Sequence, residues 1–141
     1  MIKKIGSAKW SGGLRDGKGH VSTQSGVLSD QPYGFNTRFE DGTGTNPEEL
    51  IAAAHAACFS MALSMILGEH DMIADSIATK ATVSLEKQDA GFTITKVHLD
   101  VTATIPGASS EAFMEAANAA KAGCPVSRLL NADITMDAHL A

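Results

Sequence analysis

The stretch that decides the fold is TNPEELIAAAHAACFSMALSMILGEHD, which covers Thr45 to Asp71. Its start carries the signals of a helix, since Asn46 is a good N-cap residue and Pro47 suits the first helical position. From Leu50 to Leu67 nearly every residue is apolar or small. The pattern predicts one long helix that is apolar on all sides. Such a helix belongs in a core or an interface rather than on a surface.

The composition limits the class of protein. The chain has 141 residues, which is enough for one core, so we expect a single domain over residues 1–141. A net charge of −5 argues against a nucleic-acid or anionic-membrane partner. The two lysines near the N-terminus have no apolar run behind them, so we expect no signal peptide. The Ala-rich run from Leu50 to Leu67 is short for a membrane span. We therefore expect a cytoplasmic protein.

In the segments around the long helix, apolar and polar residues alternate as they do in β-strands. Three strands are expected before it and three after it, and a second helix is expected over residues 109–122, with strands at 3–10, 19–28, 35–40, 77–85, 92–105 and 134–140. The alternation changes phase near Thr95-Lys96, which predicts a β-bulge. The order βββ-α-ββ-α-β predicts an α+β fold with antiparallel sheets, a long buried central helix and a second helix.

The two cysteines leave several interpretations open, because no CxxC motif links them. They fit buried structural thiols, part of a metal site, or a redox pair. Cys124 precedes Pro125 at the expected start of a short helical turn, where backbone N–H groups favour a thiolate, although an inert cysteine at a helix junction fits as well. Cys58 lies in the middle of the long helix and needs a cation from elsewhere. Arg38 is the best supplier.

Two further residues of the long helix could serve a site. Glu48 precedes Cys58 by roughly 15 Å along a straight helix, so the two meet only if two copies of the helix pack antiparallel. His55 shares a face with Cys58, and a metal site of His55, Cys58 and Cys124 would lack ligands. We expect His55 to be a packed, hydrogen-bonded core residue.

Longer segments carry a specific resemblance. GFNTRFEDGTGTNPEELIAAAHAACFSMALS, AGFTITK and KAGCPVS closely resemble the OsmC subfamily of the OsmC/Ohr proteins, the osmotically inducible and organic hydroperoxide resistance proteins. The likeness covers essentially the whole chain. It implies an OsmC-like intertwined homodimer, with two sites at the subunit interface. It also implies a thiol-dependent peroxidase that prefers organic hydroperoxides and requires no metal, flavin or haem.

The resemblance also implies residue roles. Cys58 would be the thiol that attacks the peroxide, and Cys124 the thiol that resolves it. Arg38 would hold Cys58 as a thiolate, and Glu48 would pair with Arg38, in its own or the partner subunit's site. Arg15 matches the position from which the Ohr branch takes its arginine, so it is a second candidate. The implied reductant is a dithiol, for which the resemblance suggests the lipoyl type.

An alternative function is a non-catalytic dimeric module that binds a small apolar ligand, with both cysteines structural. A metal-dependent hydrolase is a weaker alternative. Apolar side chains are candidates for lining a pocket for the organic tail: Phe35, Phe39, Phe59 and Met61.

Overall fold

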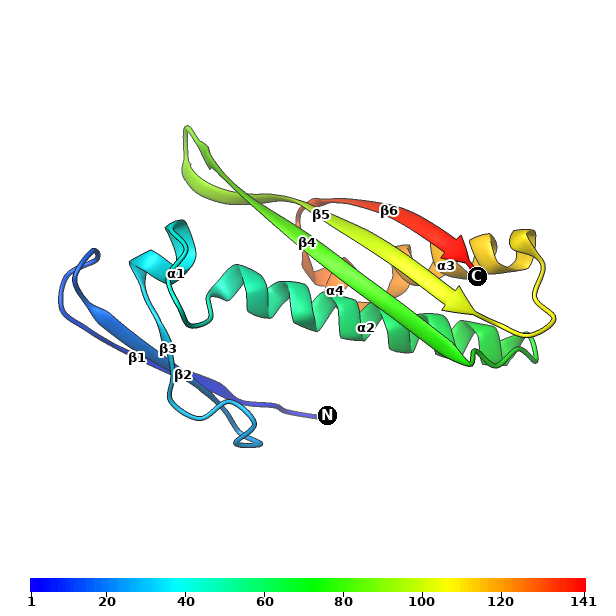
Figure 1. Ribbon diagram of the computed structural model, residues 1–141, viewed down its shortest axis with the longest axis horizontal. Helices are drawn as coiled ribbons and strands as arrows, with labels where there is room; N and C mark the ends of the chain where they lie inside the picture. The colour runs from blue at the N-terminus through cyan, green and yellow to red at the C-terminus, as the bar shows by residue number, and fades with distance from the viewer. The chain divides into compact units, whose positions relative to one another are not determined.

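The computed structural model describes residues 1–141 and contains six strands and four helices. It divides into two compact units, residues 1–50 and residues 51–141. Each unit carries its own three-stranded sheet (Figure 1). The order of elements confirms the α+β class, with two short helices, α1 (Phe35–Phe39) and α4 (Pro125–Leu129), added to the expected order.

The first unit contains an antiparallel sheet in the order β1-β2-β3, formed by β1 (Gly6–Ser11), β2 (Lys18–Thr23) and β3 (Gln31–Tyr33). The second strand ends at Thr23, short of the expected end, because the chain turns through Gly26 at φ 79°. The rings of Trp10 and Tyr33 lie 5.7 Å apart over this sheet. A Cβ at Gly19 would lie 2.5 Å from the Tyr33 ring, so only glycine fits beneath it.

The segment expected as a strand at 35–40 is a helix, and that prediction is wrong. α1 spans Phe35–Phe39. Thr37 Oγ1 accepts from the backbone N–H of Gly34 at 2.8 Å and donates to the Gly34 carbonyl at 3.0 Å, which closes the turn. Residues i and i+4 share a face in a helix as well as in a strand, so the Phe35–Phe39 spacing did not distinguish the two. Their rings lie 4.9 Å apart.

The long helix α2 spans Pro47–Glu69, within the range that the sequence predicts. Asn46 is its N-cap, since Asn46 Oδ1 accepts from the backbone N–H of Glu49 at 2.7 Å. The helix ends where Asp71 adopts a left-handed φ of 57° and the backbone N–H of Met72 donates to Leu67. The expected start and end are both confirmed.

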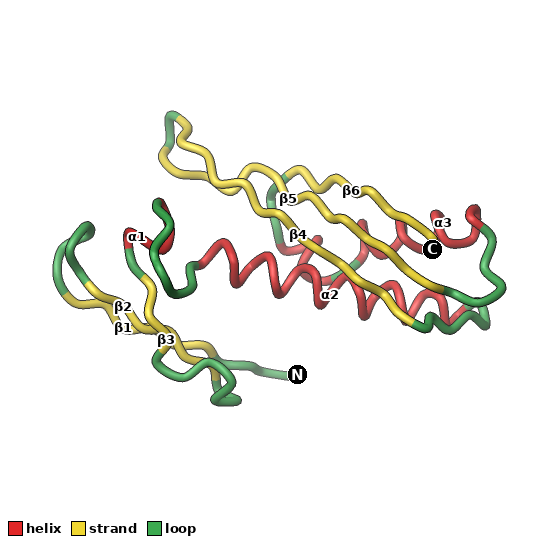
Figure 2. Tube along the Cα trace, in the orientation of Figure 1, coloured by secondary structure: helices red, strands yellow, loops and turns green.

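The second unit holds a sheet in the order β4-β5-β6 (Figure 2), formed by β4 (Ser76–Gln88), β5 (Gly91–Thr104) and β6 (Asp133–Leu140). Ser84 pairs with Lys96 and Leu85 pairs with Ile94, which leaves Thr95 as the extra residue. The predicted bulge is therefore confirmed.

One strand pairing differs from the prediction of antiparallel sheets. β5 and β6 run parallel. Parallel neighbours need a crossover connection, and helices α3 (Ser110–Gly123) and α4 (Pro125–Leu129) supply it. Ser109 caps α3 by accepting from the N–H of Ala112, which places the helix where the sequence predicts it.

Helices α2 and α3 cover one face of this sheet, and their apolar residues form the core with β5 (Figure 1). Along α2 the fully buried side chains recur every four residues: His55, Phe59, Leu63 and Leu67. The opposite face of α2 exposes Ala53, Ala57, Met61 and Met65, which we call the exposed stripe. Within one chain the helix is therefore buried on one side only, whereas the sequence predicts a helix that is apolar on all sides and lies in a core or an interface.

By length and composition alone α2 could cross a membrane, with a mean hydropathy of 2.0 over an 18-residue window that is 22% buried. The buried side of the helix packs into the hydrophobic core of the second unit.

Candidate active site

Both cysteines line one cavity of about 450 Å³ in the second unit. Cys58 is half-buried on α2, and Cys124 is buried at the junction of α3 and α4. Uncharged residues of α2 and α3 complete most of the wall, among them Met61, Ala62, Met65, Ile66 and Ala119. The tertiary structure thus brings together two thiols that lie far apart in the sequence, beside an apolar space.

The surroundings of Cys58 favour the neutral thiol. Burial raises the pKa of Cys58, and the neighbouring Cys124 thiol raises this pKa further. A backbone hydrogen bond from Val126, at the start of α4, opposes them. No cationic side chain is among these causes. The expectation that Cys58 needs a cation from elsewhere therefore fits its local environment.

Cys124 has polar contacts of its own. It is the N-cap of α4, where its Sγ accepts from the backbone N–H of Ser127 at 3.4 Å. The Ser127 hydroxyl lies 3.2 Å from the same sulfur and 2.7 Å from Nε2 of His55. The prediction of a packed, hydrogen-bonded His55 is confirmed. Ser127 was missed, although its place three residues after an expected N-cap could have indicated it.

Arg38 and Glu48 lie together in the first unit. Nη2 of Arg38 is 2.6 Å from Oε1 of Glu48, and Nε is 3.0 Å from the same oxygen and 3.2 Å from Oε2. The side chain of Glu48 is 12% exposed and that of Arg38 is 39% exposed. The contact expected between these residues is present, made by α1 and the first turn of α2.

Arg15, the alternative arginine, does not share this carboxylate. Its guanidinium lies over the ring of Phe35, 4.9 Å from the centroid. A second cavity, of about 180 Å³, is lined in the same unit by Arg38, Phe35 and Phe39 together with Trp10. Of the four apolar side chains expected at a pocket, Phe59 is instead in the core with no exposed surface.

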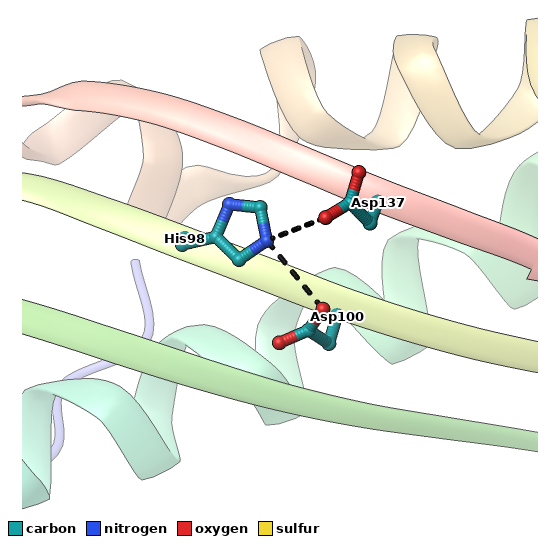
Figure 3. A group of neighbouring side chains, drawn as sticks. All are labelled: His98, Asp100 and Asp137. Atoms are coloured by element: carbon teal, nitrogen blue, oxygen red, sulfur yellow. Dashed lines mark hydrogen bonds and ion pairs between the residues drawn. The ribbon is translucent and has the colours of Figure 1, made fainter.

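The candidate metal set of His55, Cys58 and Cys124 is not assembled as ligands around one point. The group that is close enough is His98, Asp100 and Asp137 (Figure 3). His98 Nε2 lies 3.1 Å from Asp137 and 3.4 Å from Asp100, while Nδ1 lies 2.6 Å from the Thr135 hydroxyl. Both ring nitrogens already have hydrogen-bond partners in the protein, Thr135 and Asp137 on β6.

Comparison with known proteins places this geometry in a family. Residues 40–139 match the model of the OsmC-like proteins. The chain is 59% identical over 139 residues to peroxiredoxin OsmC of Escherichia coli, covering 99% of this chain and 97% of that protein. This chain belongs to the OsmC-like family. The resemblance seen in its sequence is confirmed.

Members of the Ohr branch are more distant relatives of this OsmC-like chain. Organic hydroperoxide resistance protein OhrB of Bacillus subtilis is 32% identical over 86% of this chain and 88% of that protein. The crystal structure of OhrB of B. subtilis superposes with a TM-score of 0.70 at 30% identity, covering 97% of this chain and 98% of that chain. The predicted OsmC-like fold is therefore confirmed.

Proposed function

We propose that this protein is a thiol-dependent peroxidase that reduces organic hydroperoxides, and hydrogen peroxide more weakly, in defence against oxidative or osmotic stress. The observation that carries the proposal is the single apolar cavity lined by both cysteines. Such a cavity accommodates the organic tail of a hydroperoxide, and two adjacent thiols can supply the two electrons. The relatives named a peroxiredoxin and an organic hydroperoxide resistance protein support the same chemistry.

Cys58 acts first in the proposed cycle. Its thiolate attacks the oxygen distal to the organic group, the O–O bond breaks, and the alkoxide takes up a proton and leaves as alcohol. Cys58 becomes a sulfenic acid. Cys124 then attacks the Cys58 sulfur, the S–O bond breaks, water leaves and a disulfide forms. A dithiol reductant, of the lipoyl type in our proposal, restores both thiols and is itself oxidised to a disulfide.

Arg38 is the cation that we assign to Cys58, with Glu48 fixing the orientation of its guanidinium. The assignment is supported by the need of Cys58 for a cation and by the two-nitrogen contact between Arg38 and Glu48. A guanidinium near the sulfur lowers the pKa of the thiol and can also hydrogen-bond the peroxide. Arg15 is the alternative, and its contact with Phe35 gives it no comparable carboxylate partner.

The exposed stripe of α2 supports a homodimer. Met61 is 76% exposed and Met65 is 62% exposed, on a helix whose mean hydropathy is 2.0. The other two residues of the exposed stripe, Ala53 and Ala57, are small and permit close approach of a second helix. An antiparallel arrangement about a two-fold axis would bring Glu48 of one subunit toward Cys58 of the other. Light scattering or sedimentation tests the dimer, and a fully active monomer would dismiss it.

Other expectations stay predictions. These are the single functional domain over residues 1–141, the cytoplasmic location, and the lack of a nucleic-acid or membrane partner. The near full-length match to the E. coli relative supports the single domain.

Titration of thiols in the full-length, reduced protein tests the function. Free thiols are counted before and after addition of one equivalent of cumene hydroperoxide. Loss of both thiols in each chain supports the peroxidase with a Cys58–Cys124 disulfide. Loss of one thiol alone contradicts the resolving role of Cys124. No loss favours the non-catalytic module that binds an apolar ligand.

A further inference from the structure

A chain of three buried polar groups leads to the sulfur of Cys124. Nε2 of His55 on α2 lies 2.7 Å from the Ser127 hydroxyl, and this hydroxyl lies 3.2 Å from Cys124 Sγ. The three residues are 0%, 7% and 1% exposed. The contact joins α2 to α4 through the core.

His55 occupies a place in the helix that an apolar side chain would fill at lower cost. It belongs to the buried stripe of α2, with Phe59, Leu63 and Leu67. Its Nδ1 is buried and has no hydrogen-bond partner in the protein. Burying an unsatisfied polar atom destabilises the folded state. The one polar contact of the imidazole is Ser127, so any effect of its basicity on chemistry passes through that hydroxyl.

We propose that His55 and Ser127 form a proton relay that deprotonates Cys124 when Cys124 attacks the Cys58 sulfenic acid. The inference rests on the proposed function, in which Cys124 is the resolving thiol. Ser127 contacts the reacting sulfur directly, whereas His55 is a positioning and proton-accepting residue that acts through Ser127.

The step balances in atoms and electrons. The Cys124 S–H proton passes to Ser127 Oγ, and the hydroxyl proton of Ser127 passes to His55 Nε2, which must be the unprotonated nitrogen of the neutral ring. The Cys124 sulfur attacks Cys58 Sγ, an S–S bond forms and the S–O bond breaks. Cys124 is oxidised and the sulfenic sulfur is reduced. The departing hydroxide recovers the proton from His55 through Ser127 and leaves as water.

The surroundings of the relay suit a neutral base. Burial lowers the pKa of His55, so the ring is neutral near pH 7 and able to accept a proton. No charged side chain is among the causes of this shift. The cavity beside Cys124 has no charged residue in its wall from α2, α3 or α4, and Cys58 is the other titratable group there. The proton therefore has one buried acceptor within hydrogen-bonding reach of Cys124, by way of Ser127.

Three substitutions separate proton transfer from support of the fold. His55→Gln keeps a group that can hydrogen-bond Ser127 but cannot take up a proton. Ser127→Ala breaks the relay by removing one hydroxyl, and Ser127→Thr restores a hydroxyl. Matched controls are Ser60→Ala, which removes a hydroxyl of α2 bonded to Ala56 and Thr79, and His98→Gln, which removes a histidine bonded to Thr135 and Asp137.

The two chemical steps are followed separately in the full-length protein after rapid mixing with one equivalent of cumene hydroperoxide. A dimedone trap detects the sulfenic acid of Cys58, and mass spectrometry of quenched samples detects the disulfide. We expect sulfenic acid to form at the unaltered rate in every variant. We expect the disulfide to form about 100-fold more slowly in His55→Gln and Ser127→Ala, the loss typical of a missing general base. Ser127→Thr should recover most of the rate.

The pH profile distinguishes a base from a structural residue. In the unaltered protein the disulfide step should slow as the pH falls through the lowered pKa of His55, since the protonated ring accepts nothing. This dependence should be absent in His55→Gln. Disulfide formation at the unaltered rate in both variants would overturn the relay, and a slow step in Ser127→Ala alone would overturn the part assigned to His55. If His55→Gln does not fold, Ser127→Ala tests the hydroxyl, and the pH profile of the disulfide step in the unaltered protein tests His55. Failure of Cys58 to form sulfenic acid in the unaltered protein would instead refute the proposed function.

Discussion

The guanidinium of Arg38 donates hydrogen bonds from two nitrogens to the carboxylate of Glu48, with Nη2 2.6 Å and Nε 3.0 Å from Oε1. The helical turn of α1 and the first turn of α2 make this contact possible. The Asn46 side-chain amide strengthens the arrangement by donating to the Thr37 carbonyl at 2.9 Å. These contacts fix the orientation of the guanidinium, which the role that we propose for Arg38 requires.

Removal of each cysteine should affect a different step. Cys58→Ser should abolish hydroperoxide consumption, because no thiolate is left to attack the peroxide. Cys124→Ser should permit one turnover and then stall, because the sulfenic acid cannot be resolved. Residual hydroperoxide is measured over time with excess reductant. Undiminished multiple turnover by the Cys58 variant would refute the assignment.

Removal of the Arg38 guanidinium should raise the pKa of Cys58. Without a cation, burial and the Cys124 thiol dominate, so less thiolate exists at neutral pH. We expect sulfenic acid formation in Arg38→Ala to be slower by about tenfold or more near pH 7, and the deficit to shrink as the pH rises. Rapid mixing over a range of pH values measures both effects. Arg15→Ala is the matched control, and a larger loss there would transfer the role to Arg15.

The two faces of α2 should respond differently to truncation. Phe59 has no exposed surface, so Phe59→Ala should lower the free energy of unfolding by about 3–5 kcal/mol. Met61 is 76% exposed within one chain, so Met61→Glu should leave the fold of each subunit intact and convert dimers to monomers. Urea unfolding and sedimentation measure the two outcomes. A dimer of Met61→Glu with unaltered affinity would place the interface elsewhere.

The stability of the protein should depend on His55 at mildly acidic pH. Burial lowers the pKa of His55 below 6.5, so the unfolded chain takes up a proton at pH values where the folded chain does not. The free energy of unfolding should therefore fall as the pH drops below about 6.5, until the pH reaches the pKa of the folded state. Urea unfolding on both sides of this pH should show a smaller fall for His55→Gln. An equal fall in both proteins would assign the acid sensitivity to other groups.

Local sequence signals predicted most elements because the forces behind them act over a few residues. The Asn46 cap of α2, the bulge at Thr95 and the start of α4 at Pro125 all occur where the pattern indicates them. The strand predicted at 35–40 was wrong because the spacing of its aromatic residues suits a strand and a helix equally. The expectation of antiparallel sheets was wrong for β5 and β6, which run parallel, because strand direction depends on how the connecting helices cross the sheet.

The sequence by itself determined the α+β class, the long apolar helix and the family to which the chain belongs. It also singled out Cys58, Cys124, Arg38 and Glu48. Only the tertiary structure decided that both thiols line one cavity, and that His55 and Ser127 reach Cys124 through the core. The physical reason is the separation along the chain over which residues interact, since helix caps and hydrophobic periodicity depend on close neighbours in the sequence. Contacts between α2 and α4 form only when the apolar faces of several elements pack together and leave their buried polar groups to find partners.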